Sequence, residues 1–150
     1  MPKVILTANT DWYLYNFRLS LARDLRNLGN EVVLVSPPGR FAEKLEKAGF
    51  RWIPWNLGRK SVAPWSEIGS IRELVRIFKQ EAPNLVHNHT IKPVLYGSIA
   101  ARVARVPACV NSVTGRGYVF LADDTRARFL GMLVKPFYRV AFGHPACGVI

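Results

Sequence analysis

Residues 84–93 read Asn84-Leu-Val-His-Asn-His-Thr-Ile-Lys-Pro93, an apolar segment that runs into two histidines, a hydroxyl group and a lysine. Pro83 ends the helical pattern before this segment, and Pro93 is tolerated in the first turn of a following helix. The pattern predicts helix, strand, loop and helix in succession. In open α/β sheets, ligands bind beyond the carboxyl ends of such strands. The first candidates for function are therefore the polar residues at the end of this strand: His87, His89, Thr90 and Lys92.

The composition is that of one globular domain. The chain has 150 residues, of which 49% are hydrophobic and 21% charged, so it can bury a sizeable core. No segment approaches ~18 uncharged apolar residues, and the apolar run near the amino end is too short for a signal peptide. We expect a cytoplasmic protein without a membrane-spanning helix. Cys109 and Cys147 lie in apolar surroundings without CxxC spacing, which favours buried thiols over a disulfide or a metal site.

The net charge of +11 indicates attraction to anionic surfaces. Lipid head groups, nucleic acid and phosphorylated substrates all fit such a charge. No recognised nucleic-acid motif or arginine-rich run accompanies it, so we rank nucleic acid below a membrane surface or a phosphate group as the partner.

The first half of the chain predicts three strands and two helices. We expect strands at residues 3–8, 31–36 and 50–55, the last at a sheet edge because it contains a proline, and helices at residues 16–29 and 40–48. Asn16 is placed to cap the first helix and Gly29 to close it. The buried face of that helix is predicted to carry four apolar residues: Phe17, Leu21, Leu25 and Leu28.

The second half predicts three more strands and three more helices. An apolar stripe marks the helix before the opening segment: Ile68, Ile71, Leu74, Val75 and Phe78. The opening segment supplies the fourth strand, and the helix after it is rich in small residues that permit close packing on a sheet. A strand at residues 108–113, a glycine loop, a helix at about 125–143 and an apolar run at 146–150 complete the pattern.

Strands that alternate with helices through short loops predict an α/β fold with a mainly parallel, open sheet and helices on both faces. The expected architecture is Rossmann-like, with strand order 3-2-1-4-5-6. That order places the switch point between the first and fourth strands, and it gathers residues 9–11, 89–92 and 114–117 around one crevice. Because the chain stops inside the sixth apolar run, we expect further sequence after Ile150.

The loop after the first strand reads Ala8-Asn-Thr-Asp11 and has no GxGxxG pattern, so NAD or FAD binding is not predicted. Gly115-Arg-Gly117 is a lone GxG that either serves backbone geometry alone or brings backbone N–H groups to a phosphate. His87 and His89 point to one face of a strand. The remaining histidine is His144 and a zinc site needs three or four ligands, so no metal is predicted. We expect His87 to be a satisfied core histidine, whereas for His89 a functional and a structural role both stay open.

Three separated motifs resemble the amino-terminal domain of glycosyltransferase family 4. They are Asn9-Thr-Asp-Trp-Tyr-Leu-Tyr-Asn-Phe-Arg18, residues 85–93 with Tyr96-Gly-Ser-Ile-Ala-Ala-Arg102, and Asn111-Ser-Val-Thr-Gly-Arg-Gly-Tyr-Val-Phe120. The similarity is greatest to bacterial transferases that add a sugar to a polyprenyl-diphosphate-linked saccharide. It implies one half of a GT-B fold of two Rossmann-like domains, in which this domain holds the acceptor. The nucleotide-sugar donor would be held by a carboxyl-terminal domain with paired glutamates, which these 150 residues do not contain.

The resemblance also implies the acceptor-binding residues, which lie in the same three motifs: Asn9, Asp11, Asn16, Arg18, His89, Thr90, Lys92, Thr114, Gly115, Arg116, Gly117 and Tyr118. Thr114 stands where many members of the family carry a histidine, and Arg116 stands where relatives have an apolar residue. Retaining transferases of this type need neither a metal nor a cofactor besides the nucleotide sugar. Residues 1–150 alone are therefore expected to be inactive in sugar transfer, and no catalytic residue is assigned.

Two alternatives stay open at this point. The chain is either the acceptor-binding half of a retaining transferase or a stand-alone acceptor-binding subunit that docks at membranes. In both cases we expect peripheral attachment at the inner face of the cytoplasmic membrane. Arg128, Lys135 and Arg139 share one face of the helix after the glycine loop and are predicted to face an anionic membrane surface.

Overall fold

The computed structural model describes residues 1–57, 64–112 and 147–149, with side chains described for residues 1–57 and 67–112. Six parallel strands form one sheet in the order β3-β2-β1-β4-β5-β6. They are β1 (Lys3–Thr7), β2 (Glu31–Ser36), β3 (Arg51–Pro54), β4 (Leu85–His89), β5 (Ala108–Ser112) and β6 (Cys147–Val149). The predicted Rossmann-like sheet and its strand order are confirmed.

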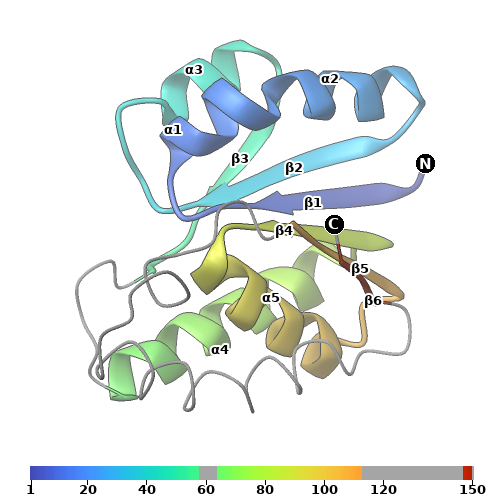
Figure 1. Cartoon of the computed structure of the whole chain (residues 1–150). Helices are drawn as coiled ribbons and strands as arrows, with labels where there is room; N and C mark the ends of the chain where they lie inside the picture. The colour runs from blue at the N-terminus through green and yellow to red at the C-terminus, as the bar shows by residue number, and fades with distance from the viewer. Residues whose placement is uncertain (58–63, 113–146, 150) are drawn as a thin grey trace, which may run out of the picture.

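Helices cover the sheet in two layers (Figure 1). One layer holds α1 (Asp11–Tyr13), the π-helix η1 (Leu14–Arg18), α2 (Leu19–Asn27) and α3 (Ala42–Lys47), and the other holds α4 (Pro64–Glu81) and α5 (Ile91–Ala104). Each layer encloses its own apolar core. Val4, Leu6 and Leu34 face the first layer, while Ile5, Val33 and Val86 face the second. This alternation is the period of two expected of β-strands.

The first helical segment differs from its prediction. It begins at Asp11 because the Thr10 side chain accepts a hydrogen bond from the Tyr13 N–H at 3.0 Å, so Thr10 and not Asn16 caps it. A π-turn in η1 then adds a residue to one turn, so positions before and after it do not share one face. Phe17 and Leu28, predicted to be buried, are 52% and 79% exposed.

Leu14, Leu19 and Ala22 form the buried face of this segment. The closing residue was predicted correctly, because Gly29 adopts a positive φ of 85° after the last turn.

The apolar stripe of α4 is confirmed at Leu74 and Phe78, which are fully buried. Ile68 is an exception, because its side chain is 42% exposed in the first turns of the helix. In α5 the small residues pack closely on the sheet as expected. Gly97 lies against Asn88 of β4, and a Cβ at Gly97 would come within 3.0 Å of that side chain.

Candidate functional site

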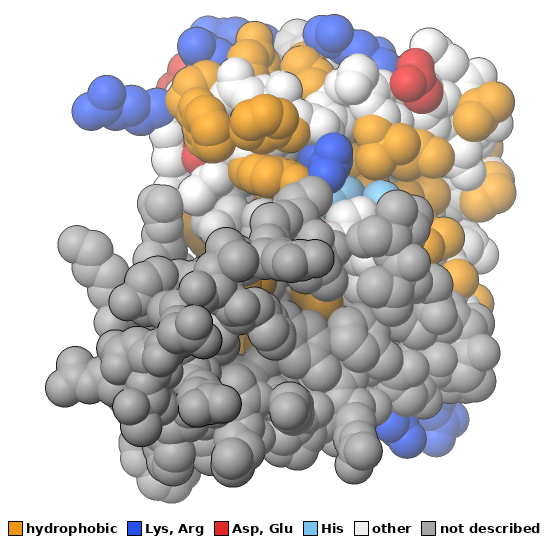
Figure 2. Space-filling model, viewed as in Figure 1, with side chains coloured by type: hydrophobic (Ala, Val, Ile, Leu, Met, Phe, Trp, Pro, Cys, Tyr) orange, Lys and Arg blue, Asp and Glu red, His pale blue; other side chains and the backbone are white. Residues whose placement is uncertain are grey.

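The carboxyl ends of β1 and β4 lie side by side, because Thr7 and Asn88 are partners in the parallel register. The loop after β1 and the segment from His89 to Thr90 therefore meet at the same edge of the sheet, as the sequence predicts. Alternation along β4 turns His87 and His89 toward the layer of η1 and α2. Figure 2 shows histidine atoms at the surface of the molecule beside a basic side chain.

The site has Arg18 at its centre, at the end of η1. Its Nε donates to His89 Nδ1 at 3.0 Å, one terminal nitrogen donates to the Tyr13 hydroxyl at 2.9 Å, and the other donates to the Phe17 carbonyl at 3.1 Å. The guanidinium carbon also lies 5.3 Å from the centre of the Tyr13 ring. We call Tyr13, Arg18, His87, His89 and Thr90 the arginine–histidine site.

Both histidines of this site are neutral at physiological pH. Burial, and then the charge of Arg18, lowers the pKa of His87 to about 4. Burial, followed by His87 and Arg18, lowers the pKa of His89 to about 2. Because a guanidinium only donates, His89 Nδ1 must accept and the proton of the neutral ring sits on Nε2.

The Nε2–H group of His89 and the hydroxyl of Thr90 are both buried without a hydrogen-bond partner among the described residues. Thr90 also has a φ of 71° and a ψ of 161°, a conformation that glycine adopts far more easily than threonine. Backbone strain of this kind and unpaired buried polar atoms are both concentrated at functional sites. The structure thus favours a functional role for His89 and Thr90, although no residue of the site is assigned a catalytic step.

His87 contacts both His89 and β5. Its Nε2 lies 2.6 Å from the hydroxyl of Ser112, and its ring centre lies 4.0 Å from that of His89. The expectation of a satisfied histidine holds for this contact, but the side chain is half-buried at the edge of the site and not inside the core.

Asp11, predicted to bind the acceptor, lies in the structure as a helix cap. Its buried carboxylate accepts hydrogen bonds from the backbone N–H groups of Phe41 and Ala42, at 2.7 and 3.0 Å, at the start of α3. A third bond comes from the Trp12 N–H at 2.8 Å. The Asp11 carboxylate therefore pairs with backbone N–H groups at the amino end of α3 that would otherwise lack a partner within the helix.

Of the other predicted residues of the first motif, Arg18 belongs to the arginine–histidine site, whereas the structure shows no hydrogen bond from Asn9 or Asn16 to it among the described residues. Asn16 is exposed and donates to the Trp12 carbonyl at 2.8 Å, and Asn9 is half-buried in the loop after β1.

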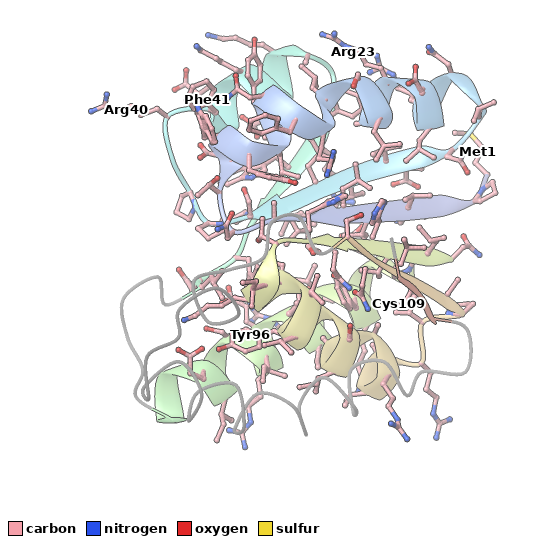
Figure 3. The ribbon with its side chains drawn as sticks, viewed as in Figure 1. Met1, Arg23, Arg40, Phe41, Tyr96 and Cys109 are labelled. Carbon is pink, nitrogen blue, oxygen red and sulfur yellow. The ribbon has the colours of Figure 1, made fainter. Side chains whose placement is uncertain are left out.

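Lys92 is held by the layer of α4 and α5. Its ammonium pairs with Glu67 of α4 at 3.1 Å, and the Tyr96 hydroxyl donates to the same carboxylate. Burial, and then this hydrogen bond with Glu67, raises the pKa of Tyr96. Tyr96 lies within that layer (Figure 3), and the ion pair that the structure shows for Lys92 is made there with Glu67.

Sequence reasoning singled out neither Tyr13 nor Glu67. Tyr13 lies five residues before Arg18, whereas side chains on an α-helix meet at spacings of three or four. Glu67 has no signal in the sequence, because its partners come from a separate helix.

Several predicted residues lie outside the described part of the chain. They are Thr114, Gly115, Arg116, Gly117 and Tyr118 of the glycine loop, and Arg128, Lys135 and Arg139 of the basic helix face. Within the described residues, no group of three or more metal-ligating side chains is gathered. The same residues contain no helix with an apolar span long enough to cross a bilayer. That the site works without a metal stays a prediction.

A parallel sheet of this order, with polar groups at the carboxyl ends of the two strands at the switch point, defines a Rossmann-like ligand-binding domain. Among solved structures, the fold matches that of MurG from Acinetobacter baumannii with a TM-score of 0.62 and 18% sequence identity. The match covers 99% of this chain and 44% of that one. The expected GT-B type of Rossmann-like domain is supported by this likeness.

The chain belongs to the Glycosyl transferase 4-like family, whose sequence pattern matches residues 3–143. A relative from Campylobacter jejuni subsp. jejuni serotype O:2 is 22% identical over 129 residues, which are 86% of this chain and 34% of the relative. That relative is an N,N'-diacetylbacillosaminyl-diphospho-undecaprenol alpha-1,3-N-acetylgalactosaminyltransferase.

A second relative, from Escherichia coli, is a UDP-Gal:alpha-D-GlcNAc-diphosphoundecaprenol alpha-1,3-galactosyltransferase. It is 29% identical over 76 residues, which are 51% of this chain and 19% of the relative. The chain thus spans about a third of the length of the first relative and about a fifth of the second.

Proposed function

We propose that this domain binds the acceptor in a retaining glycosyltransferase that moves a sugar from a nucleotide sugar to a polyprenyl-diphosphate-linked saccharide. The observation that carries this is the position of the polar residues. They lie at the carboxyl ends of β1 and β4, the switch point at which open α/β sheets bind ligands. Both relatives act on saccharides joined through a diphosphate to undecaprenol, which supports this class of acceptor.

Retention and the need for a donor-binding domain are parts of the same proposal. Both relatives form an alpha-1,3 linkage, and retention gives that product from a donor sugar that is itself α-linked to its nucleotide. The family match ends at residue 143, while the relatives are about three and five times longer than the segments that align with this chain. A domain outside these residues would bind the nucleotide sugar, and no other cofactor and no nucleic-acid partner is proposed.

Peripheral attachment to the cytoplasmic face of the membrane is also proposed. The net charge of +11 favours an anionic lipid surface. Trp12 and Phe17, 48% and 52% exposed, form an edge-to-face pair with ring centres 5.3 Å apart, and aromatic side chains of this kind favour the membrane interface. Nearby, Phe41 lies at the surface beside Arg40, which points away from the molecule (Figure 3).

We propose that the main membrane contact is the basic face predicted for Arg128, Lys135 and Arg139. Co-sedimentation with anionic and neutral vesicles tests it. Reversing the three charges to glutamate should lower binding to anionic vesicles on the order of a hundredfold, because each basic residue near such a surface contributes about 1 kcal/mol. Equal binding of the two proteins would assign the membrane contact to another surface.

The test of the whole proposal is a transfer assay with a radiolabelled UDP-sugar and an undecaprenyl-diphosphate-linked saccharide. We expect residues 1–150 to bind the acceptor but not to transfer sugar, and we expect transfer when the domain that binds the donor is supplied. Acceptor binding that never leads to transfer with any donor domain would instead support a stand-alone binding subunit. Absence of acceptor binding would overturn the proposal.

A further inference from the structure

We propose that Arg18 binds the diphosphate group of the acceptor and that His89 is the positioning residue that aims its guanidinium. This inference rests on the proposed function, because it names the part of the lipid-linked acceptor that the arginine–histidine site would recognise. It assigns to this site a ligand chemistry, a contacting residue and a supporting residue.

The first argument is that Arg18 is a partly buried cation whose hydrogen bonds within the described residues all go to neutral groups. Its acceptors in the structure are an imidazole nitrogen, a phenol oxygen and a backbone carbonyl. Among the described residues, no carboxylate forms an ion pair with it. By contrast, Lys3, Arg51 and Lys92 each pair with a glutamate. A guanidinium in this setting keeps its full charge available for an anion.

The second argument concerns geometry. The guanidinium has five N–H groups, and the hydrogen bonds to the described residues use three of them. Two N–H groups on a planar fork remain, which is the arrangement that matches two oxygens of a phosphate. The bonds from Nε and the terminal nitrogens restrict rotation of the side chain, so it loses little conformational freedom when an anion binds.

The third argument is that the neighbouring unpaired groups are also donors. His89 carries its proton on Nε2, and Thr90 supplies a hydroxyl; both atoms are buried without a partner among the described residues. Thr90 precedes α5, a helix of 14 residues whose amino end carries a partial positive charge. One cation, two unpaired donors and a helix amino end suit a ligand that is anionic and rich in acceptor oxygens.

The role of His89 follows from its tautomer. A neutral imidazole that accepts from Arg18 Nε holds the guanidinium without neutralising it, whereas a carboxylate at this position would cancel the charge that the ligand needs. Tyr13 provides the second neutral contact through its hydroxyl and its ring. His89 therefore acts through Arg18 and is not itself assigned to the reacting atoms.

The experiment measures the binding of three probes by calorimetry: farnesyl diphosphate, inorganic diphosphate and UDP. Arg18→Gln should weaken farnesyl diphosphate and inorganic diphosphate by 10- to 100-fold, the range of a lost bidentate charge-assisted contact, and should leave UDP unchanged. Arg18→Lys keeps the charge but loses the fork, so it should give an intermediate loss. Arg76→Gln, an equal charge change at an exposed position of α4, is the matched control and should change binding less than about twofold.

The positioning role is tested by two changes at His89. His89→Asn keeps an acceptor near the place of Nδ1 and should retain most of the affinity, while His89→Leu removes it and should resemble Arg18→Gln. In the transfer assay, Arg18→Gln and His89→Leu should each raise KM for the lipid-linked acceptor and leave KM for the nucleotide sugar unchanged. Urea unfolding identifies any variant that is not folded. If one of the two Arg18 variants is unfolded, the other provides the test.

Each outcome separates this inference from the proposed function. Sugar transfer with an unchanged acceptor KM in Arg18→Gln and Arg18→Lys overturns the inference alone. A loss of affinity confined to UDP also overturns it, because Arg18 would then bind the diphosphate of the donor and not that of the acceptor. Equal affinities of His89→Asn and His89→Leu overturn the positioning role. If no transfer occurs but the Arg18 variants lose both diphosphate probes, the inference stands and the proposed function fails.

Discussion

Acidification should destabilise this protein well before its carboxylates are protonated, because two histidines are buried in neutral form. In the unfolded chain each has an ordinary pKa near 6.5, whereas the folded values are about 4 for His87 and about 2 for His89. Below about pH 6.5 the unfolded state therefore binds more protons than the folded state, so protonation favours unfolding. The stability that these residues contribute is complete above the unfolded pKa and is lost as the pH falls toward the folded pKa.

The magnitude follows from the two pairs of pKa values. At about pH 7.5 each histidine is largely neutral in both states, whereas at about pH 5 each is almost fully protonated in the unfolded chain and almost fully neutral in the folded one. Linkage then gives a loss of about 2 kcal/mol for each residue, or about 4 kcal/mol together. For a domain whose free energy of unfolding is roughly 5–15 kcal/mol, this is a large fraction of the total.

Urea unfolding followed by tryptophan fluorescence measures this loss at a series of pH values. His87→Gln and His89→Asn each remove one titrating group, so each should reduce the loss between about pH 7.5 and about pH 5 by about 2 kcal/mol. The comparison uses the change with pH and not the absolute stability, because either substitution can alter contacts at every pH. His144 is present in all three proteins, and its contribution cancels when the pH dependences are subtracted.

The reasoning is refuted if the variants lose as much stability as the unmodified protein over this range. Such a result would mean that both histidines titrate near their ordinary pKa in the folded state. Direct titration of the imidazole resonances by NMR provides an independent reading. It should show the rings of His87 and His89 neutral at about pH 5.

Other predictions concern stability and are measured by the same unfolding experiment. Gly97→Ala should lower the free energy of unfolding by about 1–3 kcal/mol, because a Cβ there would come within 3.0 Å of Asn88. Gly69→Ala, whose Cβ meets nothing within 4 Å, should raise it by about 0.4–1 kcal/mol, and equal effects at the two glycines would contradict the packing described for α5. Asp11→Ala should cost about 1–2 kcal/mol through loss of the α3 cap, and Asp11→Asn, which keeps an acceptor oxygen, should cost less. Thr90→Gly should stabilise by about 1 kcal/mol by relieving the φ of 71°, and no gain relative to Thr90→Ala would argue against strain.

The sheet could be predicted because each of its strands is marked by a pattern within a few consecutive residues. Each buried strand is a short apolar run bounded by proline, glycine or polar residues, and the right-handed crossover rule leaves few ways to connect six of them. The same rule predicts that the carboxyl ends of β1 and β4 lie at the same edge of the sheet. For that reason His89 and Thr90 could be proposed as site residues from their position at the end of a strand.

The partners of the site residues could not be predicted in the same way. The π-turn in η1 changes which face Arg18 occupies, and nothing in the spacing of apolar residues marks such a turn. Acceptor binding by Asp11 and Lys92 stays a prediction, and the contacts that the structure shows for them, from Asp11 to the start of α3 and from Lys92 to Glu67, were not predicted. Both contacts join segments about 25 to 30 residues apart, so they depend on how the layers pack.

The polar residues of β4 serve both faces of the strand, and this arrangement explains how a strand so rich in polar groups keeps its register. On the α5 side, Asn88 accepts from the Thr7 hydroxyl at 2.8 Å and donates to Asn111 at 2.9 Å, and Asn111 donates to Ser98 of α5 at 2.8 Å.

All four side chains of this network are buried, so breaking one bond would leave an unpaired polar group in the core. A slip of β4 by one residue would turn Asn88 toward η1 and the histidines toward α5, where Gly97 lies directly against the Asn88 side chain. The network behind the strand thus holds His87 and His89 on the face where Arg18 meets them. For this reason we expect Asn88→Ala to weaken diphosphate binding as well as stability, although Asn88 lies on the opposite face of the strand from the arginine–histidine site.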